Sequence, residues 1–241
     1  MEQKILAEDM QKMIRSVCRV IVNNESYLTQ IDNQSGDGDH GIGMRRGFSQ
    51  LETLLRDYSY TTINELFYQS GLMLLKTMGG ASGVLFGTLF VGGLKGLPAI
   101  QSVNLCQFAN MIHQSLCAIM RRGRTRLGEK TMVDALAPAA RSLLDSAEVG
   151  RDFRDALEHA AVAAYKGSEA TATMIAQKGR ARQYGEKSIG CRDAGAVSIS
   201  LIFAEMSHWA NGHPDVFQTH DTTNTDGGKK NGEKSDHLGS R

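Results

Sequence analysis

The sequence is poor in proline, in aromatic residues and in excess charge of either sign. Its 241 residues include only 3 prolines and 1 tryptophan, and aromatic residues make up 6% of the chain. Because proline breaks helices, its scarcity favours a largely helical fold. Basic residues number 27 and acidic residues 26. A balance this even gives no support to a nucleic-acid-binding protein with a broad basic face.

The cysteines are few and scattered: Cys18, Cys106, Cys117 and Cys191. None belongs to a CxxC pair or has the Cys/His spacing of a zinc site. The first four residues lack the basic-then-apolar order of a signal peptide. We therefore expect reduced thiols and a cytoplasmic protein.

A long hydrophobic run is also missing. Residues 77–94 carry no charge, but six of them are glycines and others are serine or threonine. The segment is poorly apolar, and its length barely reaches the minimum for crossing a bilayer. We therefore expect neither a membrane span nor a membrane partner.

Apolar residues recur at spacings of three and four, as in amphipathic helices. The first stripe consists of Leu6, Met10, Met13, Ile14, Val17, Val20 and Ile21. Similar stripes cover residues 48–55, 63–78, 84–94, 105–120, 132–144, 153–175 and 196–209. No segment alternates convincingly as a β-strand would, which excludes Rossmann and P-loop architectures. The pattern predicts an all-α bundle of about eight helices.

The C-terminal part differs in composition from the rest. From Gln218 to the end, the only large apolar residue is Leu238. Such a segment cannot bury enough surface to offset the entropy lost on ordering. We expect one folded domain over residues 1–212 and a polar, disordered tail over residues 213–241.

Residues 31–44 interrupt the helical pattern with closely spaced carboxylates. Asp32, Asp37 and Asp39 lie within eight residues and alternate with glycines. Carboxylates this close repel one another unless a cation or strong hydrogen-bond donors neutralise them. Oxygen ligands suit Mg²⁺ or Ca²⁺. A helix predicted to begin near Met44 follows directly.

The three carboxylates could belong to an EF-hand, cap the next helix or bind Mg²⁺. An EF-hand is excluded, because Gly43 and Phe48 stand where its bidentate glutamate would follow Asp32 or Asp37. A single aspartate would more simply cap the next helix. Three together favour Mg²⁺, which completes its coordination with phosphate and water.

A second irregular segment, Gly79-Gly80-Ala81-Ser82-Gly83, precedes an apolar helix. Such a turn lets backbone N–H groups approach an anion at a helix N-terminus. Alternatively, Gly83 and Gly87 only let two helices pack closely. The sequence alone leaves both readings open.

A third irregular segment, residues 178–192, combines glycines with five cations: Lys178, Arg180, Arg182, Lys187 and Arg192. Guanidinium groups suit phosphate. Lys187 and Arg192 fit a solvated loop well, whereas Arg180 is the better phosphate-binding candidate. A helix is predicted to begin near Ala196.

A related turn, Gly128-Glu129-Lys130-Thr131-Met132, also precedes a helix. It is not a Walker A motif, because Glu129 intrudes before Lys130 and no strand precedes it.

In this order, the motifs resemble those of the L subunit of dihydroxyacetone kinases. The matching residues are Asp32-x4-Asp37-Gly38-Asp39-His40-Gly41, Gly79-Gly80-Ala81-Ser82-Gly83, Gly128-Glu129-Lys130-Thr131-Met132-x-Asp134-Ala135, and Gly179-Arg180-Ala181 through Asp193-x-Gly195-Ala196. The resemblance covers roughly residues 6–209. It implies a closed barrel of eight antiparallel helices that holds a nucleotide at one end.

The resemblance also implies a set of site residues. Two Mg²⁺ ions that bridge the nucleotide phosphates would be held by Asp32, Asp37 and Asp39. Further phosphate contacts would come from His40, Gly41, Ile42, Gly43, Ala81, Ser82 and Arg180. The nucleotide would be lined by Gly123, Met132, Asp193, Ala194 and Gly195. The three metal-binding aspartates and Arg180 would carry catalysis, since phosphoryl transfer of this kind needs no protein nucleophile.

The partners implied by the resemblance are a ketose-binding K subunit and a nucleotide, ADP or ATP. Bound ADP would be rephosphorylated in place by a phosphohistidine protein of the phosphotransferase system. The alternatives are an ATP-dependent kinase for another small ketose such as erythrulose, and a nucleotide-sensing module that binds a transcription regulator. The oligomeric state is open, with a homodimer as one candidate.

Overall fold

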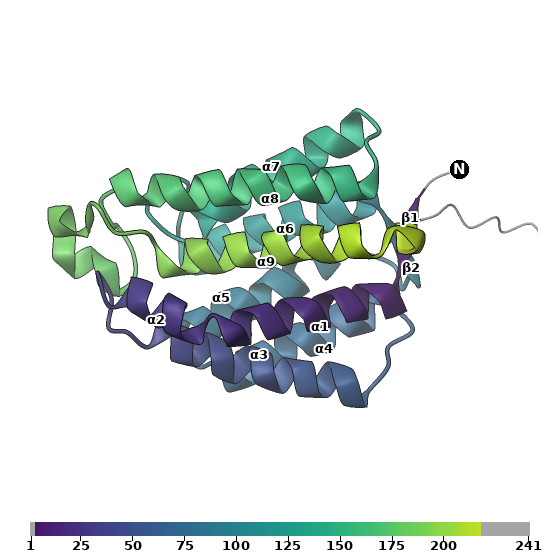
Figure 1. The fold of residues 1–241 in the computed structure, drawn as a ribbon, viewed down its shortest axis with the longest axis horizontal. Helices are drawn as coiled ribbons and strands as arrows, with labels where there is room; N and C mark the ends of the chain where they lie inside the picture. The colour runs from purple at the N-terminus through teal and green to yellow at the C-terminus, as the bar shows by residue number, and fades with distance from the viewer. Residues whose placement is uncertain (1–2, 218–241) are drawn as a thin grey trace, which may run out of the picture.

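The computed structural model describes residues 3–217, which form a bundle of long helices (Figure 1). The α-helices in this part of the chain are α1 (Ala7–Asn23), α2 (Glu25–Asp32), α3 (His40–Asp57), α4 (Ile63–Thr77), α5 (Gly80–Val91), α6 (Leu105–Gly123), α7 (Val133–Glu148), α8 (Phe153–Ala170) and α9 (Ala194–Gly212). Short 3-10 segments are η1 (Gly92–Leu94), η2 (Thr171–Thr173), η3 (Arg180–Ser188) and η4 (Pro214–Phe217).

Eight of these helices close a ring. α1 packs on α3, and α3 to α9 then pack each on the next, until α9 packs back on α1. α2 follows α1 after a break at Asn24 and contacts α3 and α9. Neighbours in the ring run in opposite directions, and the connections between them lie at alternating ends (Figure 1). The predicted closed barrel of eight antiparallel helices is confirmed.

Two short strands correct the expectation that the chain has none. β1 (Lys4–Leu6) and β2 (Ser102–Asn104) pair antiparallel, with Ile5 opposite Val103. Strands of three residues are too short to produce a recognisable alternation of polar and apolar side chains. They tie the start of α1 to the start of α6 at one end of the ring.

The core fills the inside of the ring with the predicted apolar stripes. Phe153 joins two other aromatic rings, with centroid distances of 5.5 Å to Phe108 and 5.4 Å to Phe217. Phe217 belongs to η4 and is 1% exposed. The folded body therefore extends at least to residue 217, beyond the boundary placed at residue 212. The remainder of the predicted tail, residues 218–241, lies outside the described residues.

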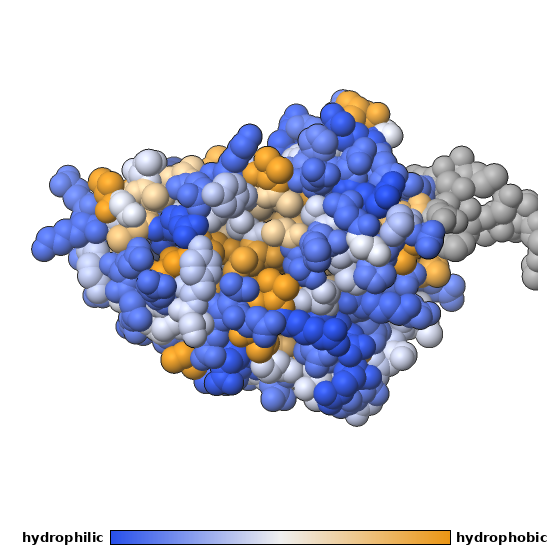
Figure 2. Space-filling view, in the orientation of Figure 1, coloured by the Kyte–Doolittle hydropathy of each residue, from blue (hydrophilic) through white to orange (hydrophobic). Residues whose placement is uncertain are grey.

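The outer surface is mostly hydrophilic on the face seen in Figure 2. Hydrophobic residues come into view mainly over the middle of α8, α9 and α1. None of the helices described for residues 3–217 is both long and apolar enough to cross a membrane. Within the uncharged stretch 77–94, α5 runs only from Gly80 to Val91, which is too short to cross a bilayer.

Candidate functional site

Several helices begin at the same end of the ring, the end that lies opposite the two strands. Because neighbouring helices alternate in direction, α3, α5, α7 and α9 all begin there (Figure 1). The first turn of a helix has unpaired N–H groups and a partial positive charge. This end of the molecule is therefore suited to binding anions.

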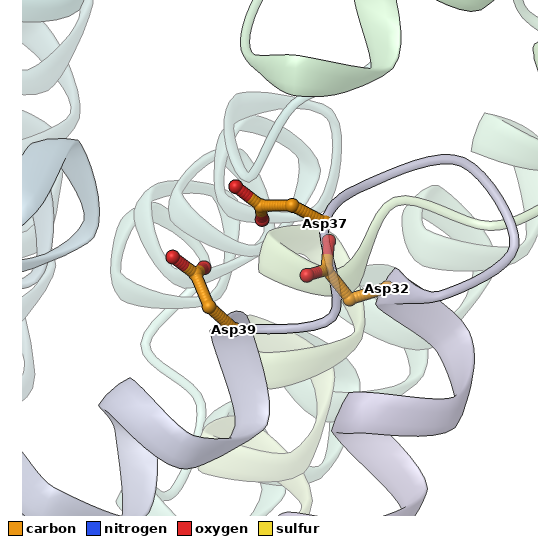
Figure 3. A group of neighbouring side chains, drawn as sticks. All are labelled: Asp32, Asp37 and Asp39. Carbon is orange, nitrogen blue, oxygen red and sulfur yellow. The ribbon is translucent and has the colours of Figure 1, made fainter.

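Three carboxylates meet at the same end. Asp32 ends α2, Asp37 lies in the connecting loop, and Asp39 directly precedes α3. Each offers one oxygen, and these oxygens all lie within 4.8 Å of one another. Figure 3 shows the three side chains converging on a common space. The predicted cluster thus forms, with a spacing that fits oxygen coordination of a divalent cation.

The charge of the cluster is poorly compensated. Burial, followed by the charge of Asp37, raises the pKa of the Asp39 carboxyl. A nearby cation comes from Arg180, whose Nε lies 3.0 Å from Asp37 Oδ2. One guanidinium beside three carboxylates leaves a net negative charge that a bound cation would neutralise.

The loop between α2 and α3 is shaped by its glycines. The N–H of Gly36 donates to the carbonyl of Asp32 at 2.5 Å. A Cβ on Gly36 would lie only 2.1 Å from Asp32 Oδ1, so a larger residue would displace that carboxylate. Gly38 has a φ of +78°, which favours glycine. We call residues 32–39 the acidic loop.

The residues from His40 to Gly43 form the first turn of α3, not a turn ahead of a helix that begins near Met44. The prediction placed the boundary too late, because two of the four residues are glycines and carry no apolar periodicity. Ile42 is 48% exposed. Gly41 is buried, and a Cβ there would lie 2.2 Å from Thr29 Oγ1 of α2.

The side chain of His40 turns away from the carboxylates into the core. Its Nε2 lies 2.8 Å from Ser198 Oγ of α9. That hydroxyl donates to the carbonyl of Ala194, so it accepts from the histidine. Burial lowers the pKa of the imidazole. His40 therefore links α3 to α9 through its ring, and only its backbone faces the site, where its N–H donates to Asp32 Oδ2 at 3.2 Å.

Ala81 and Ser82 lie in the first turn of α5, which begins at Gly80, four residues earlier than predicted. Gly80 follows Gly79, and both have positive φ. Gly87, in contrast, packs on α4, where a Cβ would lie 2.9 Å from the carbonyl of Gly71. The packing interpretation therefore holds for Gly87, while anion binding by the turn before α5 stays a prediction.

The residues predicted to line a nucleotide lie around the same end. Gly123 is the last residue of α6, and the buried Met132 directly precedes α7. Ala194 and Gly195 form the start of α9. A Cβ on Gly195 would lie 3.3 Å from Met132 Cβ, so the starts of α7 and α9 touch.

Asp193 caps α9. Its Oδ2 accepts from the N–H of Ala196 at 2.7 Å, while its own N–H donates to Thr171 Oγ1 at 2.9 Å. Desolvation by the surrounding residues raises the pKa of this carboxyl to about 7. Its position fixes the N-terminus of α9 beside the acidic loop.

Arg180 opens η3, a 3-10 segment where the sequence predicted a loop, with a kink at Gly185. Its guanidinium reaches the acidic loop, and its contact with nucleotide phosphates stays a prediction. Arg192 is not a solvated cation: it pairs with Glu169 at 2.5 Å and with Tyr27 Oη at 2.7 Å.

Three residues at this end were missed as individual functional candidates. Ser198 could have been suspected as a polar residue within an apolar helix. Asp134 shapes the turn before α7, accepting from the N–H groups of Gly128 at 2.5 Å and Thr131 at 2.7 Å. Lys130 is buried, and desolvation lowers its pKa. Burial of a lysine has no signal in a single sequence.

A carboxylate cluster, a guanidinium and several helix N-termini thus share one end of a helical ring. This combination defines a protein that can hold a divalent cation together with a phosphate compound.

The chain belongs to the DAK2 domain family, whose model matches residues 34–208. It is 39% identical to the Escherichia coli PEP-dependent dihydroxyacetone kinase, ADP-binding subunit DhaL, with 79% of this chain and 91% of that protein covered. It is 35% identical to the Lactococcus lactis PTS-dependent dihydroxyacetone kinase, ADP-binding subunit DhaL, with coverages of 77% and 88%. The resemblance to dihydroxyacetone kinase L subunits is confirmed.

More distant relatives include larger proteins. L-erythrulose kinase of Pectobacterium atrosepticum is 32% identical over 84% of this chain, which spans 35% of that protein. The fold is similar to that of a solved dihydroxyacetone kinase from C. freundii in complex with AMP-PNP and Mg²⁺. The TM-score is 0.66 at 24% identity, with 82% of this chain and 33% of that chain covered.

Proposed function

We propose that this chain is the nucleotide-binding subunit of a dihydroxyacetone-type kinase and transfers phosphate to a ketose held by a separate K subunit. The observation that carries the proposal is the convergence of Asp32, Asp37 and Asp39 beside Arg180 in a member of this family. The relatives matched over most of their length are ADP-binding subunits by name, which supports ADP as the bound nucleotide.

The residues present fit Mg²⁺ with a nucleotide phosphate. All three aspartates would supply oxygen ligands to Mg²⁺, and we propose that two ions bind there. Bound Mg²⁺ would neutralise the charge of the phosphates. The N–H groups at the starts of α3 and α5 would hold phosphate oxygens, and the start of α9 would line the nucleotide.

Arg180 is the candidate for stabilising the transferred group. In the structure its guanidinium pairs with Asp37. Once a cation compensates Asp37, the same guanidinium is free to donate to phosphate oxygens, for which its fork geometry is suited. Its side chain is 73% exposed, so this reorientation meets little steric resistance.

For the donor, we propose that bound ADP is rephosphorylated in place by a phosphohistidine protein of the phosphotransferase system. The names of the relatives above, PEP-dependent and PTS-dependent, support this choice. An exchanging kinase that uses free ATP on erythrulose is the second candidate, supported by the match to erythrulose kinase.

We assign the nucleotide-binding domain to residues 1–217, in the cytoplasm. Contact with a transcription regulator is a proposal from the family resemblance, and a homodimer is one candidate for the oligomeric state.

Reconstitution tests the function. The chain is mixed with a K subunit, dihydroxyacetone and Mg²⁺, with either ATP or a phosphorylated phosphotransferase protein as donor, and phosphorylated ketose is measured. We expect product only when all components are present, and faster with the phosphoprotein. If product formed with ATP as donor as fast as with the phosphoprotein, the exchanging kinase would be favoured. No product with either donor, from dihydroxyacetone or erythrulose, would contradict the proposal.

A further inference from the structure

Lys130 is a buried lysine whose ammonium group donates its hydrogen bonds to backbone carbonyls. Lys130 as a whole is 1% exposed to solvent. Among the described residues, the hydrogen-bond partners of Nζ are four carbonyl oxygens: those of Thr171 at 2.9 Å, Met174 at 3.3 Å, Ser188 at 2.6 Å and Cys191 at 2.5 Å. An ammonium has three N–H donors, so at least one is shared. Nζ is thus fully engaged and has no donor left for a ligand.

The four carbonyls lie at the base of one long connection. Two of them, from Thr171 and Met174, lie where the chain leaves α8. The other two, from Ser188 and Cys191, lie where it returns toward α9. We call residues 174–191 the Arg180 loop. A buried charge is costly unless it is well hydrogen-bonded, so the ammonium holds both sides of this base together.

The tip of the Arg180 loop reaches the acidic loop. Arg180 pairs with Asp37 at 3.0 Å, and the hydroxyl of Tyr184 donates to the carbonyl of Gly36 at 3.3 Å. Most of η3 is exposed, so its own packing contributes little to holding it in place. The direction in which Arg180 points therefore depends on how the base is fixed.

The other ties at the base are neutral hydrogen bonds and partly exposed ion pairs. Lys178 Nζ lies 3.6 Å from Glu129 Oε2, and Arg192, directly after the Arg180 loop, pairs with Glu169. Ion pairs that are open to solvent contribute little to stability. The N–H of Ala176 donates to Ser188 Oγ at 3.0 Å, and the N–H of Gly190 donates to the carbonyl of Ala172 at 2.8 Å. Hydrogen bonds to a charged donor are roughly twice as strong as neutral ones. Lys130 supplies the largest share of the fixation, from a backbone with a φ of +58° just before α7.

We propose that Lys130 is a positioning residue that clamps the base of the Arg180 loop and so directs Arg180 to the phosphate beside the acidic loop. The proposal rests on the proposed function for its effect on catalysis, but the clamp itself does not require a nucleotide. Lys130 would act through Arg180 and would not touch the substrate.

The first test is hydrogen–deuterium exchange without nucleotide on wild type, Lys130→Met and a matched control, Gln11→Met. Methionine is unbranched and has no N–H donor; its side chain is as long as that of glutamine and one atom shorter than that of lysine. Gln11 is a suitable control because its amide donates to the carbonyls of Leu55 and Tyr58, both at 2.7 Å, where α3 ends. We expect exchange in residues 174–191 to accelerate at least about tenfold in Lys130→Met only. Unchanged exchange there, or equal acceleration in the control, would overturn the proposal.

The second test is a double-mutant cycle with Arg180→Ala, using phosphoryl transfer as the readout. We expect Lys130→Met to lower kcat by roughly 100-fold, as misplacement of a reacting group does, with a smaller change in the affinity for Mg²⁺–ADP. In the Arg180→Ala background the same substitution should lower kcat less than about threefold, because the group that it positions is already missing. If Lys130→Met lowered kcat by about 100-fold in the Arg180→Ala background as well, the two residues would act independently and the proposal would be overturned.

Two safeguards keep the outcome clear. If Lys130→Met does not fold, Lys130→Gln, which keeps two N–H donors, takes its place, and the same exchange criterion applies. If wild type transfers no phosphate, the proposed function fails, while the exchange experiment still decides whether Lys130 clamps the loop.

Discussion

Individual aspartates in this protein have different roles, although they occur in similar sequence motifs. Asp32, Asp37 and Asp39 converge with little compensating charge, whereas Asp134 and Asp193 accept backbone N–H groups at the starts of α7 and α9. The first group keeps an excess of negative charge that a bound cation would neutralise, and the second fixes helix starts around it. Substitutions in the two groups should therefore have different consequences.

Asp37→Ala should abolish phosphoryl transfer and the rise in melting temperature that Mg²⁺–ADP produces, because it removes a metal ligand. Helicity should remain nearly unchanged, since Asp37 lies in a loop and is exposed. Circular dichroism, thermal melting and a transfer assay measure these effects. Asp57→Ala at the far end of α3 is the matched control and should behave like wild type. Retained transfer in Asp37→Ala would disprove the metal assignment.

Asp193→Asn should change how stability depends on pH. Burial raises the pKa of Asp193 to about 7 in the folded protein, from the ordinary value of 3.8 for an aspartate in an unfolded chain. Between these values the folded state holds a proton that the unfolded state has released, so the free energy of unfolding falls as pH rises. The slope is at most about 1.4 kcal/mol per pH unit for one proton.

The measurement is urea unfolding from pH 4 to pH 8 without Mg²⁺ or nucleotide. We expect wild type to lose stability relative to Asp193→Asn as pH rises through this window, and the difference to level off above about pH 7. Parallel curves would mean that Asp193 is ionised in the folded protein at low pH.

At the scale of whole elements, close helix contacts depend on particular glycines. A Cβ on Gly167 of α8 would lie 2.2 Å from the carbonyl of Asp134 and 3.0 Å from Cα of Ala135, both on α7. Backbone atoms cannot give way as a flexible side chain can, so any substitution separates the two helices. The same contact fixes the start of α7 near the site.

Gly167→Ala should therefore destabilise the protein by about 1–3 kcal/mol, despite the better helix propensity of alanine. Gly212→Ala at the end of α9 is the control, because nothing lies within 4 Å of a Cβ there. It should change stability by less than about 0.5 kcal/mol. Chemical denaturation of both variants measures the difference, and equal stabilities would contradict the close α7–α8 contact.

Periodicity predicted the ring helices well and their ends less well. α3 and α5 each begin about four residues before the predicted start, since their first turns contain two glycines each and no apolar stripe. α2 was missed because its eight residues lie next to a stronger pattern. The paired strands, with three residues each, were missed because tertiary contact rather than local pattern forms them.

At the scale of the whole molecule, antiparallel packing in a closed ring brings the separate motifs to one end. The sequence could indicate the carboxylates, the glycine turns and Arg180, and the family resemblance indicated that they share a site. Neither the sequence nor the resemblance could show that the imidazole of His40 points into the core or that Lys130 is buried beneath the Arg180 loop. Both depend on which side chains the closed ring encloses.

The most direct test of the central claim is to ask which nucleotide the purified protein carries. The protein is denatured immediately after purification, and the supernatant is separated on an anion-exchange column calibrated with ADP and ATP. We expect near-stoichiometric ADP from the wild type and none from the Asp37→Ala variant. An empty protein that then binds Mg²⁺–ATP reversibly would favour an exchanging kinase. A protein that neither carries nor binds a nucleotide would contradict the account.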